Sequence, residues 1–103
     1  MSFTYDDRLG ISVPVLETEW ENLHYDTQAA ILEQWESIRG NIPDRIRELE
    51  QSINQLQHQL NNEEHFEKSC ELNSMISELA STINDLWIWY RTGEEVGVKK
   101  IHS

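Results

Sequence analysis

Cysteine is scarce in this sequence, and its scarcity excludes one class of fold. Cys70 is the single cysteine among 103 residues, so no disulfide can form within the chain. Small secreted folds that depend on several disulfides are therefore excluded, and one unpaired thiol fits a reducing compartment. The first eight residues also lack the basic and apolar regions of a signal peptide. We therefore expect a cytoplasmic protein.

Positive charge is also scarce. Lys and Arg together number 8 against 19 Asp and Glu, which gives a formal net charge of −11. Nucleic-acid binding needs clustered cations that neutralise phosphates, and binding to an anionic membrane surface needs a similar cluster. No apolar run has the length of a membrane-spanning helix. We expect neither a nucleic-acid partner nor a membrane partner.

Motifs that would carry an enzymatic mechanism are missing as well. The sequence has no glycine-rich phosphate loop, no nucleophile elbow and no Ser/His/Asp arrangement. A di-iron site in a helical bundle needs two Glu-x-x-His motifs, and Glu21 to His24 is the only one. Cys70 has too few ligands near it for zinc, so we interpret it as a small buried helix residue. We predict no metal, no cofactor and no catalytic residue, and an enzyme is the alternative class.

Two mirrored heptad runs form the strongest pattern that is present. Their apolar residues recur at alternating spacings of four and three, as in the seam of a coiled coil. The first run is Ile42, Ile46, Leu49, Ile53, Leu56 and Leu60, and the second is Leu72, Ile76, Leu79, Ile83, Leu86 and Tyr90. If the second run folds back on the first, one turn near residue 64 pairs every layer, from Leu56 with Leu72 to Ile38 with Tyr90.

These runs predict an all-α protein built on a long antiparallel helical hairpin. An additional N-terminal helix would complete a three-helix bundle or a helical oligomer. We expect an extended arm at 1–16, a single helical domain at 17–91 and a flexible tail at 92–103. The helices are expected at about 18–39, 43–61 and 63–91. Gly40 would end the first helix as its C′ residue, and Asp26 offers a later start for that helix, after a brief helical turn.

The last predicted helix carries a second stripe beside its seam, in which small side chains lie between aromatic ends. The stripe consists of Phe66, Cys70, Asn73, Ser77, Ala80, Asn84 and Trp87. A further helix could approach closely there, either the first helix of the same chain or a helix of another chain. Trp89 falls on the remaining side of the last helix.

The scaffold and its aromatic residues lead to a hypothesis about function. Tryptophan is enriched at the energetic centres of protein interfaces. The candidate protein-binding residues are Trp20, Phe66, Ala80, Trp87, Trp89 and Tyr90. A different interpretation is that Trp35, Trp87 and Tyr90 close the open end of the hairpin as core. We predict a non-enzymatic interaction module, an adaptor, a regulator or a homo-oligomer, whose partner is another protein or a second copy.

A short segment after the turn, Ser-Cys-Glu-Leu-Asn at 69–73, resembles a motif of the small sporulation phosphatases. These acidic helical hairpins carry Ser-Gln-Glu-Leu-Asp and dephosphorylate an aspartyl-phosphate response regulator. The resemblance covers about residues 44–78 and implies a phosphatase-like function. Its matching positions are Ser69, Glu71 and Leu72. Cys70 and Asn73 replace the amide and the acid. Because an asparagine cannot act as a carboxylate toward water or metal, binding of a response regulator would survive these changes better than hydrolysis.

The end of the last predicted helix is similar to a second family, the helical hairpins exported by type VII secretion. Tyr90 and Glu94 form a Tyr-x-x-x-Glu there, in a chain of similar length. This similarity implies an exported helical hairpin. The turn at 61–64 reads Asn-Asn-Glu-Glu, whereas that family places Trp-x-Gly in its turn.

Overall fold

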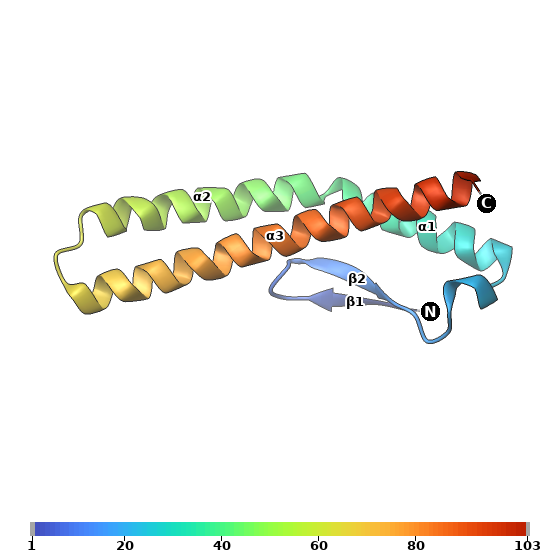
Figure 1. Cartoon of the computed structure of the whole chain (residues 1–103), viewed down its shortest axis with the longest axis horizontal. Helices are drawn as coiled ribbons and strands as arrows, with labels where there is room; N and C mark the ends of the chain where they lie inside the picture. Colours follow the sequence, from blue (N-terminus) through green and yellow to red (C-terminus); the bar gives the residue numbers. More distant parts are fainter. Residues whose placement is uncertain (1, 103) are drawn as a thin grey trace.

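The computed structural model describes the backbone of residues 2–102 and the side chains of residues 3–92. The molecule is elongated, 59 × 22 × 17 Å, and mostly helical (Figure 1). Its elements, in chain order, are β1 (Ser2–Asp6), β2 (Ile11–Val15), the 3₁₀ turn η1 (Trp20–Asn22), α1 (Tyr25–Gly40), α2 (Ile42–Asn61) and α3 (Phe66–His102). The predicted antiparallel helical hairpin is confirmed by α2 and α3, and a small β-hairpin is added to it.

The seam between α2 and α3 follows the heptad runs, with five of their twelve residues buried and the other seven half-buried. Ile42, Ile46, Leu72 and Leu86 are each at most 2% exposed. At one end of the seam, the Arg39 Nε donates a hydrogen bond of 2.9 Å to the Tyr90 carbonyl oxygen. The Arg39 guanidinium also lies 4.3 Å from the centre of the Tyr90 ring. These contacts bring residue 39 beside residue 90, as the predicted pairing of Ile38 with Tyr90 requires.

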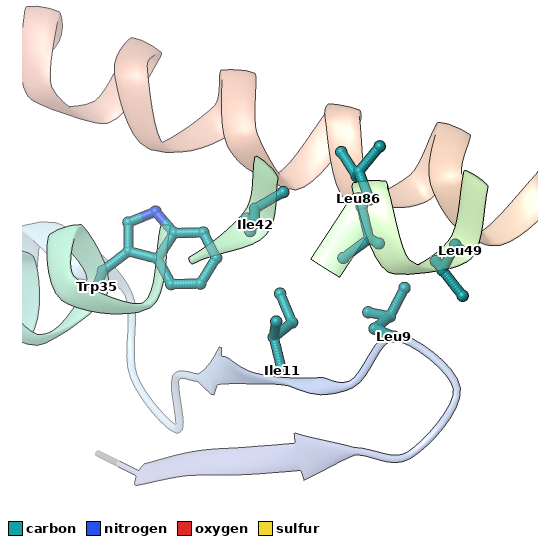
Figure 2. Packing of buried hydrophobic residues seen from close by; sticks show 7 residues of the cluster. Leu9, Ile11, Trp35, Ile42, Leu49 and Leu86 are labelled. Carbon is teal, nitrogen blue, oxygen red and sulfur yellow. The ribbon is translucent and has the colours of Figure 1, made fainter. Parts of the chain in front are cut away.

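The main core lies at the end of the hairpin where all the elements meet. Figure 2 shows Leu9 and Ile11 from the β-hairpin directed toward Ile42, Leu49 and Leu86 of the two long helices. Trp35 of α1 joins the same cluster and is 5% exposed. A fully buried Leu or Ile contributes about 1.5–3 kcal/mol, so this cluster concentrates the hydrophobic stabilisation at one end of the molecule. Toward the turn at 62–65, two helices alone form the seam.

The predicted first helix at 18–39 is wrong at its start, and the later alternative is close to the observed one. Glu19, Leu23 and His24 adopt extended backbone angles on either side of η1, so the short turn stays separate from α1. The His24 Nδ1 accepts a hydrogen bond of 3.2 Å from the Asp26 N–H. His24 therefore caps α1 through its ring nitrogen, a role that its Glu-x-x-His spacing did not indicate.

The expected C′ role of Gly40 is also wrong. Gly40 lies inside α1 and has no positive φ. Asn41 follows in a right-handed conformation (φ −91°, ψ −10°), and its carbonyl accepts the Arg45 N–H of α2 at 3.2 Å. The chain therefore passes from α1 into α2 through one bend. Because Pro43 lacks an N–H and occupies the first turn of α2, this bend costs no helical hydrogen bond there.

The predicted extended arm at 1–16 folds back on itself as an antiparallel β-hairpin. Phe3 lies opposite Pro14, and Asp6 lies opposite Ile11. The Asp6 carboxylate accepts the Leu9 N–H at 3.0 Å, and its carbonyl accepts the Gly10 N–H at 2.7 Å. This turn places Leu9 and Ile11 in the core, at 4% and 6% exposure. The segment expected to be an arm is part of the folded unit.

The bounds of the last helix differ from the predicted 63–91 at both ends. α3 begins at Phe66 and continues to His102, so its expected end at Arg91 is wrong. Residues 62–65 form the turn, and Asn62 caps the end of α2, where its backbone N–H donates to the Gln59 and Leu60 carbonyls. The side chains predicted to belong to a flexible tail, from residue 93 onward, lie outside the described residues.

Candidate protein-binding surface

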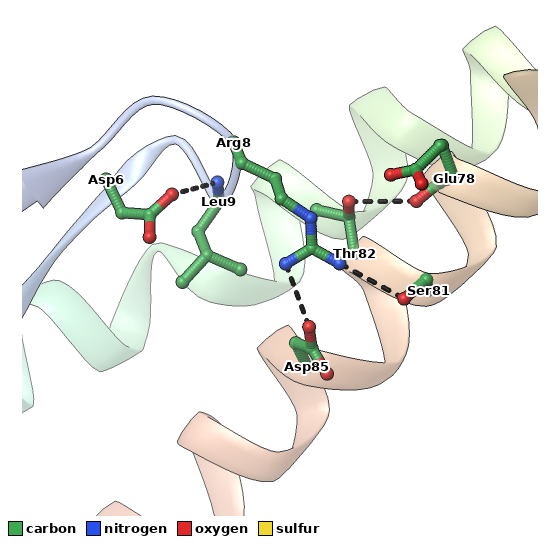
Figure 3. Close-up of polar contacts among 7 residues, drawn as sticks. All are labelled: Asp6, Arg8, Leu9, Glu78, Ser81, Thr82 and Asp85. Atoms are coloured by element: carbon green, nitrogen blue, oxygen red, sulfur yellow. Dashed lines mark hydrogen bonds and ion pairs between the residues drawn. The ribbon is translucent and has the colours of Figure 1, made fainter.

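One side of α3 is covered by the β-hairpin. Arg8 reaches from the hairpin turn to α3 (Figure 3), where its Nη1 donates to the Asp85 carboxylate at 2.8 Å and its Nη2 donates to the Ser81 hydroxyl at 3.1 Å. Thr82 is 4% exposed and donates its hydroxyl to the Glu78 carbonyl at 2.9 Å. The Arg8 ion pair is itself about 40% exposed, so it orients the hairpin more than it stabilises the fold.

Another side of α3 is open along most of the helical hairpin. Successive helical residues point about 100° apart, so the second stripe falls between the seam and the side of α3 that Arg8 contacts. We define the open face as Phe66, Cys70, Asn73, Ser77, Ala80, Asn84, Trp87 and Ile88, all of which are exposed. None of these side chains is charged. The acidic residues of the same stretch, such as Glu78 and Asp85, lie outside the open face.

The open face carries large apolar side chains at both ends. Phe66 is 81% exposed near the turn, and Trp87 and Ile88 are 40% and 47% exposed near the main core. Helical rise places Phe66 and Trp87 about 30 Å apart. Between them, small side chains such as Ser77 and Ala80 project only a short distance from the helix. An uncharged face with exposed apolar side chains at its ends, on a chain of charge −11, is a candidate surface for contact with another protein.

The structure brings together only part of the predicted binding set. Phe66, Ala80 and Trp87 share the open face, whereas Trp20 is half-buried in η1, where its carbonyl accepts the Gln28 Nε2 at 2.8 Å. Trp89 is half-buried against Trp35, and their ring centres are 5.6 Å apart at 64°. Sequence reasoning missed Ile88, because Ile88 falls outside both heptad stripes.

Tyr90 and Trp87 close the end of the seam together, but they do so unequally. Their rings meet edge to face with centres 5.6 Å apart. Tyr90 is half-buried against the core cluster, whereas Trp87 keeps 40% of its surface exposed. The interpretation in which Trp35, Trp87 and Tyr90 are all core therefore holds for Trp35 and in part for Tyr90. Trp87 remains available for contact.

Cys70 lies on the open face as an exposed free cysteine, so its interpretation as a buried residue is wrong. The physical reason is the position of α1, which runs into α2 at Asn41 and packs near Tyr90 and Trp89 instead of along the middle of α3 (Figure 1). No segment of the described chain covers the second stripe. The three-helix bundle in which α1 fills this groove is not formed.

The residues of the phosphatase-like motif lie on different sides of α3. Leu72 is 2% exposed in the seam and is unavailable for contact. Glu71 is exposed, and its carboxylate lies 3.5 Å from the Lys68 Nζ. Ser69 is half-buried. Of the type VII-like pair, Tyr90 is partly buried, and the Glu94 side chain lies outside the described residues.

The described part of the chain offers few groups for metal or substrate chemistry. Among residues 3–92, no three His, Cys, Asp or Glu side chains are arranged to hold a metal ion. A shallow hollow is lined by Asp26, Thr27, Ala30, Ile31 and Gln34, all from α1. Within the same residues, no helix combines the length and apolarity needed to cross a bilayer.

Among the described residues, Glu63 has a carboxyl group whose pKa is clearly shifted. Its carboxylate accepts hydrogen bonds of 3.1 Å from the His65 backbone N–H and from the His65 Nδ1. The backbone hydrogen bond is the main cause that lowers the pKa of Glu63 below its usual 4.5, and the side-chain hydrogen bond is the second. This contact closes the turn between α2 and α3.

We expect the stability that Glu63 contributes to depend on pH. The pKa of Glu63 is lower in the folded state than in the unfolded state. At a pH between these two values the unfolded state binds more protons, so stability rises with pH over that range. The stabilising contribution of Glu63 is fully present above pH 4.5 and is lost as the pH falls through the lowered pKa of the folded state. Urea titrations should show wild type more stable than Glu63→Gln at neutral pH, with the difference vanishing in acid. A difference that does not change with pH would contradict this assignment.

Comparison of the chain with protein-family models, curated proteins and solved structures finds no match. The exposed surface of the molecule is therefore the basis for inferring its function.

Proposed function

We propose that this chain is a small acidic protein–protein interaction module of the cytoplasm, without catalytic activity. The observation that carries the proposal is the open face of α3, an exposed and uncharged strip on a chain of charge −11. Its partner is a protein that presents a helix with an apolar stripe. The helix would lie along the open face, with the seam behind it as a rigid support.

The chemistry of the open face fits the recognition of a helix. Small side chains at Ser77 and Ala80 allow a partner helix to approach closely, at an interaxial distance of about 8–10 Å. Phe66 at one end, and Trp87 with Ile88 at the other, then act as anchors that fill gaps between the partner's side chains. The absence of charge on the open face avoids the desolvation of ions on binding.

A substitution at the centre of the open face tests this proposal. Ala80→Arg places a long charged side chain where a partner helix must pack, and because Ala80 is exposed the fold should tolerate it. Gln55→Arg introduces the same side chain at an exposed position of α2 outside the open face and serves as the matched control. The full-length chain and both variants are used as baits in cytoplasmic extract, and each captured protein is then titrated individually.

The expected result is a partner that binds wild type and Gln55→Arg equally and binds Ala80→Arg about 100-fold or more weakly, as for a disrupted interface centre. Retention of full affinity by Ala80→Arg would rule out the open face as the binding surface. Static light scattering over a concentration series shows whether a second copy is the partner, because Ala80→Arg would then reduce the measured mass.

The second candidate is a phosphatase-like protein that acts on a response regulator. The exposure of Glu71 in the matching motif favours it, because that carboxylate is accessible to a partner. Its test is the lifetime of aspartyl-phosphate on response regulators of the host, with Glu71→Ala as the control. A lifetime that the wild-type chain does not shorten for any regulator would eliminate the hydrolytic activity.

A further inference from the structure

The β-hairpin is a sheet of only two strands, so each strand has one free edge among the described residues. The two edges differ in their chemistry. β2 contains Pro14, which cannot donate a hydrogen bond and is typical of an edge protected against further pairing. β1 reads Ser-Phe-Thr-Tyr-Asp and contains neither proline nor lysine. The free edge of β1 is therefore the one open to another strand.

The backbone groups that point outward from β1 can be assigned from the turn. The Asp6 carbonyl accepts the Gly10 N–H, so the backbone of Asp6 faces β2. Backbone direction alternates along an antiparallel strand, so Thr4 also faces β2, and Phe3 and Tyr5 face outward. Pro14 agrees with this alternation, because it lies opposite Phe3, where no N–H is required between the strands. The outer edge thus presents the N–H and C=O groups of Phe3 and Tyr5.

We propose that β1 pairs with β1 of a second copy of this chain, in antiparallel orientation and centred on Thr4. The two hairpins would form one four-stranded sheet about a two-fold axis. This register is the one that pairs the whole of β1, with each Phe3 opposite Tyr5 of the second copy. Aromatic pairs across antiparallel strands are favourable, and Tyr5 is 60% exposed in the single chain.

Charge and position both favour a second copy as the occupant. Residues 2–5 carry no charged side chain, and the acidic residues of the segment, Asp6 and Asp7, follow at one end. Antiparallel pairing about Thr4 puts the two acidic ends at opposite ends of the new pair, which limits like-charge repulsion. Figures 1 and 2 both show β2 between β1 and the helices, so a second hairpin can approach β1 from outside. The interface is separate from the open face and does not depend on the proposed function.

Disulfide trapping in the full-length chain tests the register directly. In a Cys70→Ser background, Thr4→Cys would place two thiols at a directly opposed pair without hydrogen bonds, the closest approach of antiparallel strands. Under mild oxidation we expect rapid formation of a covalent dimer. Tyr5→Cys in the same background is the register control, because the two thiols lie on opposite sides of the axis. Glu17→Cys, exposed beyond β2, measures random collision.

The expected order is fast trapping for Thr4→Cys and slow trapping for the two controls. Equal rates for Thr4→Cys and Glu17→Cys would overturn the proposal. Sedimentation equilibrium of chains without an added cysteine provides the second measurement. Tyr5→Pro removes an outward N–H and should weaken dimerisation about tenfold or more, because each dimer loses two donors. Thr4→Lys should also weaken it, since it opposes two like charges. A wild type that stays monomeric at every accessible concentration would equally overturn the proposal.

Discussion

Leu86→Ala is expected to lower the free energy of unfolding by about 2–5 kcal/mol, the largest effect of any conservative change considered for this chain. Leu86 is 0% exposed and packs in the main core with Ile42, Ile46 and Leu49. Truncation removes buried methyl groups and leaves a cavity between α2, α3 and the β-hairpin. Domains of this size are stable by only about 5–15 kcal/mol, so the variant should unfold at a clearly lower urea concentration.

The matched control for this prediction is Ile88→Ala, two residues further along the same helix. Ile88 is 47% exposed on the open face, and its truncation should change stability by about 0.5 kcal/mol or less. Both variants are measured by urea titration, with helical circular dichroism as the signal. Equal losses would mean that α3 is rotated about its axis relative to the core described above, and the open face would then lose its basis.

Alanine at Gly10 and alanine at Gly40 should change stability in opposite directions. Gly10 has φ +75°, a conformation that costs other residues about 1–2 kcal/mol. A Cβ there would also meet the Arg45 side chain at 2.3 Å and displace it. Arg45 would then lose its hydrogen bond of 3.0 Å to the Leu9 carbonyl. We expect Gly10→Ala to destabilise the protein by about 2 kcal/mol or more.

Gly40→Ala is the opposite case. Gly40 lies in a helix, and a Cβ would meet nothing within 4 Å. Alanine restricts the unfolded chain and favours the helix, so we expect a gain of about 0.5–1 kcal/mol. Thermal unfolding of the two variants, side by side with wild type, checks the signs. Destabilisation by Gly40→Ala would show that the chain reverses at Gly40 in a left-handed conformation, as the sequence had indicated.

The seam was the part of the fold that the sequence predicted best. Heptad spacing is a local property of each helix, and its mirror symmetry about residue 64 left one register in which every layer could pair. Ile42, Ile46, Leu72 and Leu86 are buried accordingly. The uncharged stripe from Phe66 to Trp87 was visible for the same reason, since residues at helical spacing share a face whatever lies beside them.

The path of residues 1–41 was harder to predict, because it depends on contacts distant in sequence. The turn Asp-Asp-Arg-Leu-Gly at 6–10 contains none of the dipeptides that mark tight hairpins. Within the turn, the Asp6 carboxylate accepts the Leu9 N–H. Two contacts with the helices also hold it, namely the ion pair of Arg8 with Asp85 of α3 and the hydrogen bond from Arg45 of α2 to the Leu9 carbonyl. The burial of Trp89 against Trp35 likewise depends on where α1 comes to lie.

The sequence by itself determined the helical hairpin and its register, because the mirrored apolar spacing lets every layer of side chains pair in only one antiparallel arrangement. Only the tertiary structure decided which flank of α3 is covered. The β-hairpin takes one side through Leu9, Ile11 and Arg8, and α1 bends away at Asn41 to pack near Tyr90. The second stripe of α3 is exposed because both N-terminal elements pack elsewhere, and no pattern within α3 carries that information.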